Sequence, residues 1–96
     1  MDSHELLRLV SDEKSFLAFV EALRKERGLD AAEERVKPSS AYGPTQRGWE
    51  NVTIEAFLEA ACAWAEDANF GEAQKLRDFS LWKKFATFLY MGKIYG

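Results

Sequence analysis

The 96-residue sequence predicts an all-α fold, a small bundle of three main helices with a candidate short N-terminal helix and a long loop. Apolar residues recur at spacings of three and four in three stretches, which is the period of a helix with one buried face. A serine, threonine or aspartate able to cap the first turn precedes each stretch. Hydrophobic residues make up 47% of the chain, enough to offset the entropy of ordering it. We therefore expect residues 1–96 to fold as one helical domain.

The first main helix is predicted over residues 12–27. Its apolar stripe consists of Phe16, Val20 and Leu23. Ser11 or Asp12 is expected to cap its start, and Gly28 is expected to end it in a left-handed conformation. The segment that starts at Ser3 is expected to form a short capped helix, with an extended arm as the alternative.

Residues 30–48 are predicted to form a flexible surface loop. Two prolines and two glycines interrupt this segment, and it shows no apolar periodicity. Loops of this length in compact domains are commonly either functional or mobile, and we expect mobility here. Residues 31–36 could instead form a solvated helical turn.

The second and third main helices are predicted over residues 53–68 and 81–91. Thr53 and Ser80 are their expected caps, and Gly92 is the expected end of the third. The apolar stripes of these two helices predict a core that contains Phe57, Leu58, Trp64, Phe85 and Leu89. On that basis Phe85→Ala would cost about 3 to 5 kcal/mol.

Composition excludes several functional classes. A net charge of −3 argues against a protein that mainly grips phosphate backbones, so nucleic acid is not the expected partner. The acidic N-terminus is unlike a secretory signal and no apolar run is long enough to span a membrane. We expect a cytoplasmic protein without membrane contact.

The residues also argue against catalysis and against cofactors. With one cysteine and one histidine, the chain lacks the ligands of a zinc site, and no metal or cofactor site is predicted. Cys62 lies among alanines and is expected to be a small buried hydrophobe, whereas His4 is expected to be exposed near the terminus. Gly43 and Gly48 lack the lysine and hydroxyl residue of a nucleotide-binding loop. No catalytic residue is predicted, and an enzyme has the least support.

Three glutamates give the predicted helix 53–68 an acidic face. Glu55, Glu59 and Glu66 are spaced so that they project from nearly one side. Trp49, at the end of the loop, is expected either to anchor the loop in the core or to rim this face. We hypothesise that these four residues form a surface for a protein partner of cationic character. The alternative is a solvated acidic face without a ligand.

The second half of the chain is polarised in charge. Residues 50–67 contain five acidic and no basic residues, and residues 73–96 contain five basic residues against one acidic residue. If the second and third helices pack side by side, exposed ion pairs between them would neutralise the two faces, and this is the outcome we expect. If the faces point apart, the acidic one would attract a cationic protein, more weakly as salt rises.

Several motifs resemble a known family. They are Trp49-Glu50-Asn51, the segment Trp64 to Asp67, and the C-terminal run with Trp82, Phe85-Ala86 and Lys93-Ile94-Tyr95. Over residues 11–96 they resemble a family of small bacterial domains of unknown function. The resemblance implies a small cytoplasmic helical protein and carries no known activity, substrate or site.

The sequence thus favours a non-catalytic protein-interaction module, such as an adaptor or an immunity-type inhibitor. The alternative is a nucleic-acid accessory factor that uses the basic C-terminal third, with Lys75, Arg77, Lys83, Lys84 and Lys93. Against this alternative, the aromatic residues among those charges are expected to be buried. The oligomeric state is left open.

Overall fold

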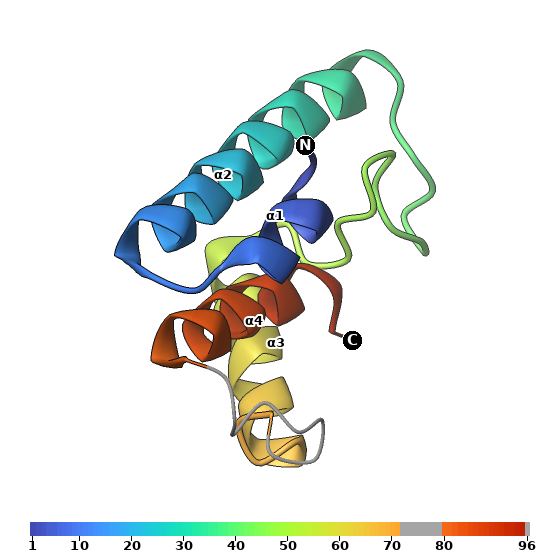
Figure 1. Ribbon diagram of the computed structural model, residues 1–96. Coiled ribbons are helices and arrows are strands. Elements are labelled where there is room, and N and C mark those ends of the chain that lie inside the picture. Colours follow the sequence, from blue (N-terminus) through green and yellow to red (C-terminus); the bar gives the residue numbers. More distant parts are fainter. Residues whose placement is uncertain (72–79, 96) are drawn as a thin grey trace.

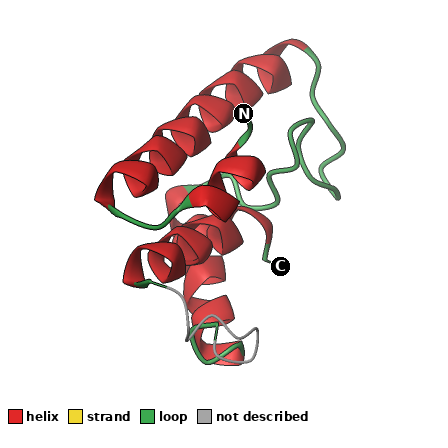
Figure 2. Cartoon of the chain, in the orientation of Figure 1, coloured by secondary structure: helices red, strands yellow, loops and turns green. Residues whose placement is uncertain are grey.

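The computed structural model describes residues 1–71 and 80–95, and this part of the chain contains helices and loops but no strand (Figure 2). Four helices follow one another along the chain: α1 (Ser3–Leu9), α2 (Glu13–Val36), α3 (Ile54–Asp67) and α4 (Leu81–Ile94). The predicted all-α class and the short N-terminal helix are confirmed.

The four helices form two pairs. α1 packs against α2, and α3 packs against α4, so each pair joins helices that follow one another in the described chain (Figure 1). α4 joins the two pairs because it contacts both α1 and α2. No α-carbon of α2 comes within 8 Å of one in α3, so these two helices leave their facing sides uncovered by each other.

Side-chain caps define where the helices begin. Asp12 accepts a hydrogen bond from the Ser15 backbone N–H, and the Ser15 hydroxyl accepts one from the Asp12 N–H, which completes a capping box. The Thr53 and Ser80 side chains cap α3 and α4, as predicted, by accepting a hydrogen bond from the backbone N–H of Ala56 and of Lys83. The cap of α1 is Asp2, one residue before the serine expected there.

α2 is nine residues longer than its predicted end, and Gly28 does not terminate it. A glycine inside a helix costs only about 1 kcal/mol, and Gly28 has no positive φ. Beyond it, Asp30 is fully buried and accepts hydrogen bonds from Arg27 and from the Arg47 backbone N–H. These bonds stabilise the helix beyond Gly28. The predicted loop is therefore wrong over residues 30–36, where the alternative of a helical segment over 31–36 is confirmed, and the loop starts at Lys37.

α4 also runs past its predicted end, with Gly92 inside the helix. A Cβ atom built on Gly92 would lie 2.8 Å from the Phe57 ring of α3. Glycine is required here because the two helices approach closely at this point, and it does not act as a stop signal.

The two helical glycines should respond to the same substitution with opposite signs. Gly28→Ala is expected to raise the free energy of unfolding by about 0.5 to 1 kcal/mol, because nothing lies within 4 Å of the added methyl group. Gly92→Ala is expected to lower it by about 1 to 3 kcal/mol through overlap with Phe57. Urea denaturation of both variants measures the difference. Stabilisation by both would show that the Phe57 ring does not rest on Gly92.

The core lies where α4 meets the other helices. Trp64 of α3 is 1% exposed, and Phe19 and Leu23 of α2 are buried with Ala86 of α4. Phe57 and Leu89 are partly buried and pack against this core, so the prediction is confirmed for Trp64 and in part for these two.

Two predicted core residues are on the surface. Leu58 is 49% exposed and Phe85 is 45% exposed, and Cys62, predicted to be buried, is exposed as well. The helical stripes of α3 and α4 are wider than the surface their neighbours cover, because α2 stays away from α3. The uncovered apolar surface borders the space between α2 and α3.

Candidate functional site

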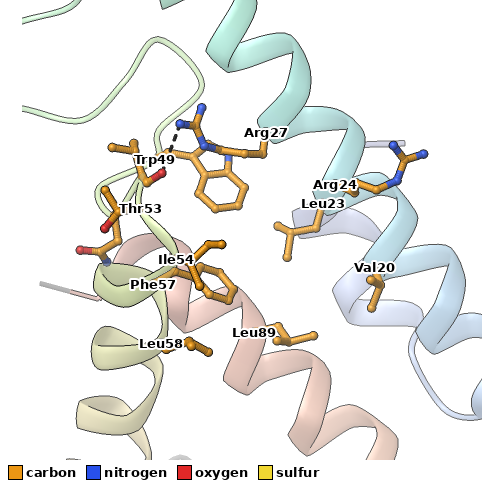
Figure 3. A pocket seen from close by; sticks show the side chains of 12 residues that line it. Val20, Leu23, Arg24, Arg27, Trp49, Thr53, Ile54, Phe57, Leu58 and Leu89 are labelled. Carbon is orange, nitrogen blue, oxygen red and sulfur yellow. Dashed lines mark hydrogen bonds between the residues drawn. The ribbon is translucent and has the colours of Figure 1, made fainter.

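An apolar groove of about 480 Å³ lies between α2 and α3. Figure 3 shows α2 along one wall, α3 along the other, and Leu89 of α4 between them. Its apolar lining includes Val20, Leu23, Ile54, Phe57, Leu58 and Leu89. All three helices contribute side chains, so the groove depends on the way the two helix pairs are joined.

The wall formed by α3 is largely exposed to solvent. Ile54 is 77% exposed and Leu58 is 49% exposed, one helical turn apart on the same side of α3. Contiguous apolar surface of this kind on a small protein marks an interaction site more often than a scattered exposed leucine does.

The apolar surface continues beyond the groove along α3 and α4. Cys62 is exposed one turn after Leu58, and Phe85 is exposed one turn before Leu89. Both positions lie on the same helix faces as the lining residues they follow or precede. The groove and these exposed positions together form a longer apolar strip.

Trp49 closes the inner end of the groove from within the core. Its side chain is 5% exposed, its ring stacks on Phe57 at a centroid distance of 6.1 Å, and two cations lie over it, Arg27 at 5.8 Å and Lys93 at 5.6 Å. The indole N–H has no acceptor among the described residues. Trp49 anchors the loop, and the hypothesis that it rims an exposed acidic face is wrong.

A buried ion pair between α2 and α4 supports Trp49. Lys93 is 7% exposed, and its ammonium group donates to the Glu26 carboxylate, which also accepts from the Ser3 hydroxyl at 2.9 Å. Three of the four helices thus meet at one carboxylate. This contact could not be predicted from the sequence, because Glu26 lies next to the predicted end of the first main helix, where a carboxylate usually faces solvent.

A second carboxylate of α2 holds the loop. Glu34 accepts hydrogen bonds from the backbone and hydroxyl of Ser39, at 2.7 and 2.6 Å, and from the backbone of Gln46 at 3.0 Å. These bonds favour the charged form, so the pKa of Glu34 lies below its ordinary value of 4.5. Tyr42, at the tip of the loop, is exposed as expected.

The attachment of the loop at Glu34 should depend on pH. Because the pKa of Glu34 is lowered by folding, its contribution is present above pH 4.5 and is lost as the pH falls through the lowered value. The amide resonances of Ser39 and Gln46 in two-dimensional NMR spectra are expected to shift together in that range. In Glu34→Gln the shift with pH should disappear. If the Ser39 and Gln46 amide resonances still shifted with pH in that variant as they do in the wild type, a group other than Glu34 would cause the shift.

The three predicted glutamates lie along one exposed edge of α3. Glu55, Glu59 and Glu66 are all exposed, and within residues 1–71 and 80–95 none of their carboxylates makes a hydrogen bond or an ion pair. The described ion pairs join neither α3 to α4 nor any other helix to α3, so the expected neutralisation between these helices is wrong for this part of the chain.

Asp67, at the end of α3, behaves differently. Its carboxylate accepts a hydrogen bond of 2.5 Å from the Tyr95 hydroxyl, and this bond raises the pKa of Tyr95 above its ordinary value of 10.0. Asp67 therefore fastens the C-terminal end of α4 to α3.

Two lysines of the basic C-terminal third make contacts within the protein. Lys93 is buried against Glu26, and the Lys83 ammonium donates to the backbone carbonyl of Arg8 at 2.7 Å. Lys75 and Arg77 lie outside the described residues. Trp82 and Phe85 are exposed, so the expectation that the aromatic residues of this region are buried is wrong for these two.

Metal sites and membrane spans both require particular residues in the described part of the chain. No three side chains of the types that ligate metals come together there. None of the helices in that part of the chain combines the length and the apolar character needed to cross a bilayer.

Comparison with known proteins gives a family and no closer relative. Neither the curated proteins nor the solved structures contain a match to this chain. One family model matches residues 12–96, which cover α2, α3, α4 and every residue that lines the groove. The chain therefore belongs to the family of unknown function DUF7660.

Proposed function

We propose that this protein is a non-catalytic protein-interaction module that binds an apolar segment of a partner protein in the groove between α2 and α3. The observation that carries the proposal is the exposure of Ile54, Leu58 and Phe85, large apolar residues on faces that are elsewhere used for the core. An adaptor and an immunity-type inhibitor would both use such a surface.

The energetics favour an occupied groove. Each Å² of apolar surface removed from water contributes about 25 cal/mol, so covering two or three large side chains supplies several kcal/mol of association free energy. Grooves between helices are a common way to bind a peptide segment through apolar anchors spaced by one helical turn. Ile54 and Leu58 have that spacing on α3.

The nucleic-acid alternative has less support. It requires several free cations near exposed aromatic rings. Trp82 and Phe85 satisfy the second requirement, but Lys93 is held by Glu26 and Lys83 by the Arg8 carbonyl. Lys84 is the remaining lysine of α4, and one cation contributes little to phosphate binding.

The proposal is tested by comparing partners of the wild type with those of two variants. Leu58→Asp places a charge in the groove wall, whereas Val36→Asp places the same charge on a more exposed apolar residue outside the groove. The wild type and Val36→Asp are used as baits, and each captured protein is then purified and titrated. We expect direct binding to the wild type and to Val36→Asp, and a loss of at least about tenfold with Leu58→Asp. Equal affinity of a captured protein for the wild type and both variants would refute the proposal.

A further inference from the structure

We propose that the partner segment is a basic amphipathic helix whose apolar face fills the groove and whose lysines or arginines lie along the acidic edge of α3. This inference rests on the proposed function and adds the chemistry of the partner. It follows from the order of apolar and acidic residues on α3, from the pairing of the arginines on α2, and from the hydrogen-bonding needs of an apolar groove.

The acidic edge of α3 runs beside the apolar wall of the groove, next to the residues that line it and not among them. Glu55 directly follows Ile54, and Glu59 directly follows Leu58. Consecutive residues of a helix are turned by about 100° from each other, so each glutamate lies next to an apolar groove residue on the side away from the core. A segment that covers Ile54 and Leu58 therefore comes within reach of both carboxylates.

These carboxylates are available to a partner. α3 carries no lysine or arginine, and the carboxylates of Glu55 and Glu59 make no ion pair or hydrogen bond within the described part of the chain. Negative charge along an apolar edge repels an acidic segment and attracts a basic one, which sets the charge of the partner.

The α2 wall of the groove does not favour an acidic partner, although two arginines line it. Arg24 and Arg27 line the groove on α2, but Arg24 pairs with Glu21 at 2.8 Å and Arg27 pairs with the buried Asp30 at 3.3 Å. Arg27 also donates to the Val52 carbonyl across the inner end of the groove (Figure 3). The charges of these two groove arginines are thus matched by the protein itself, and those of Glu55 and Glu59 are not.

A helix suits this groove better than an extended strand. The lining is almost entirely apolar side chain, so it offers few partners to the backbone N–H and C=O groups of a strand. The described residues contain no strand whose edge could pair with one. A helix satisfies its own backbone and can present apolar residues one turn apart to Ile54, Leu58 and Leu89.

The test uses the full chain and three synthetic peptides of about 18 residues, or five helical turns. The first is an amphipathic helix of leucine and lysine, the second replaces each lysine by glutamate, and the third contains the residues of the first in an order without an apolar face. Fluorescence anisotropy of labelled peptides measures their affinities at low salt and at about 1 M salt, where the Debye length falls to about 3 Å.

We expect the leucine–lysine peptide to bind at least about tenfold more tightly than the leucine–glutamate peptide at low salt, and the difference to shrink at high salt. The scrambled peptide should bind at least about tenfold more weakly than the ordered one. Equal binding of the ordered and scrambled basic peptides would overturn the inference, because attraction would then not involve the groove. Tighter binding of the leucine–glutamate peptide would overturn it as well.

Three variants locate the effect and separate the two proposals. The double variant Glu55→Lys/Glu59→Lys should reverse the preference between the two ordered peptides, and Leu58→Asp should weaken both at least about tenfold. Glu5→Lys, on α1 outside the groove, should change neither by more than about twofold. Loss of binding in Leu58→Asp without any change in preference in the double variant refutes the basic helix and leaves the groove. Unchanged binding in Leu58→Asp refutes both.

Discussion

Replacing Glu26 by alanine is expected to lower the free energy of unfolding by about 3 to 5 kcal/mol, although the residue lies on a helix that faces solvent along much of its length. The substitution leaves the ammonium of Lys93 buried without its carboxylate, and it removes the acceptor of the Ser3 hydroxyl. An unpaired buried charge costs far more than the ion pair gains, so the loss should exceed that of any exposed pair.

The control is Glu21→Ala, which breaks the exposed ion pair with Arg24 on the same helix. Its expected cost is below about 1 kcal/mol. Urea denaturation followed by circular dichroism measures both variants. The double variant Glu26→Met/Lys93→Met should recover most of the stability, because it replaces both charges by apolar groups. A loss below about 1 kcal/mol in Glu26→Ala would mean that water reaches Lys93.

Trp64→Ala is expected to cost about 3 to 5 kcal/mol, the range for a large aromatic residue removed from a closed core. Trp64 is 1% exposed, and the Phe70 ring meets its edge at a centroid distance of 5.9 Å. Phe85→Ala, which the sequence alone places in the same range, should cost less than about 2 kcal/mol because Phe85 is 45% exposed.

The quantity to compare is the loss of unfolding free energy in Trp64→Ala and in Phe85→Ala. Chemical denaturation of the wild type and both alanine variants measures these two losses. If Phe85→Ala proved as costly as Trp64→Ala, the outer face of α4 would be covered in the folded protein. The apolar strip that leads into the groove would then not include Phe85.

Local signals in the sequence were sufficient for the helix starts. Asp12, Thr53 and Ser80 cap their helices through the side chains expected to do so, because an N-cap needs only one oxygen and the backbone of its own first turn. The helix ends were less predictable. Gly28 and Gly92 are stop signals when read locally. Both helices continue past them, because Asp30 of α2 is held by the Arg47 backbone and Gly92 lies against Phe57 of α3.

The groove could not be predicted from the sequence for a related reason. A helical stripe identifies which residues are apolar on one side, and it does not say how much of that side a neighbour will cover. Leu58 and Trp64 belong to the same stripe of α3, yet one is half exposed and the other buried, because α2 approaches α4 and avoids α3. The acidic edge was predictable because it depends only on spacing within one helix.

The Glu26–Lys93 ion pair has a consequence for the order of folding events. It spans 67 positions in the chain, whereas α1 packs on α2 and α3 on α4 over short separations. Local pairs form quickly because little loop entropy opposes them, and long-range contacts form late. We therefore expect the two helix pairs to assemble first and the ion pair to form after the transition state. Stopped-flow measurements on Glu26→Ala should then show faster unfolding with a nearly unchanged folding rate.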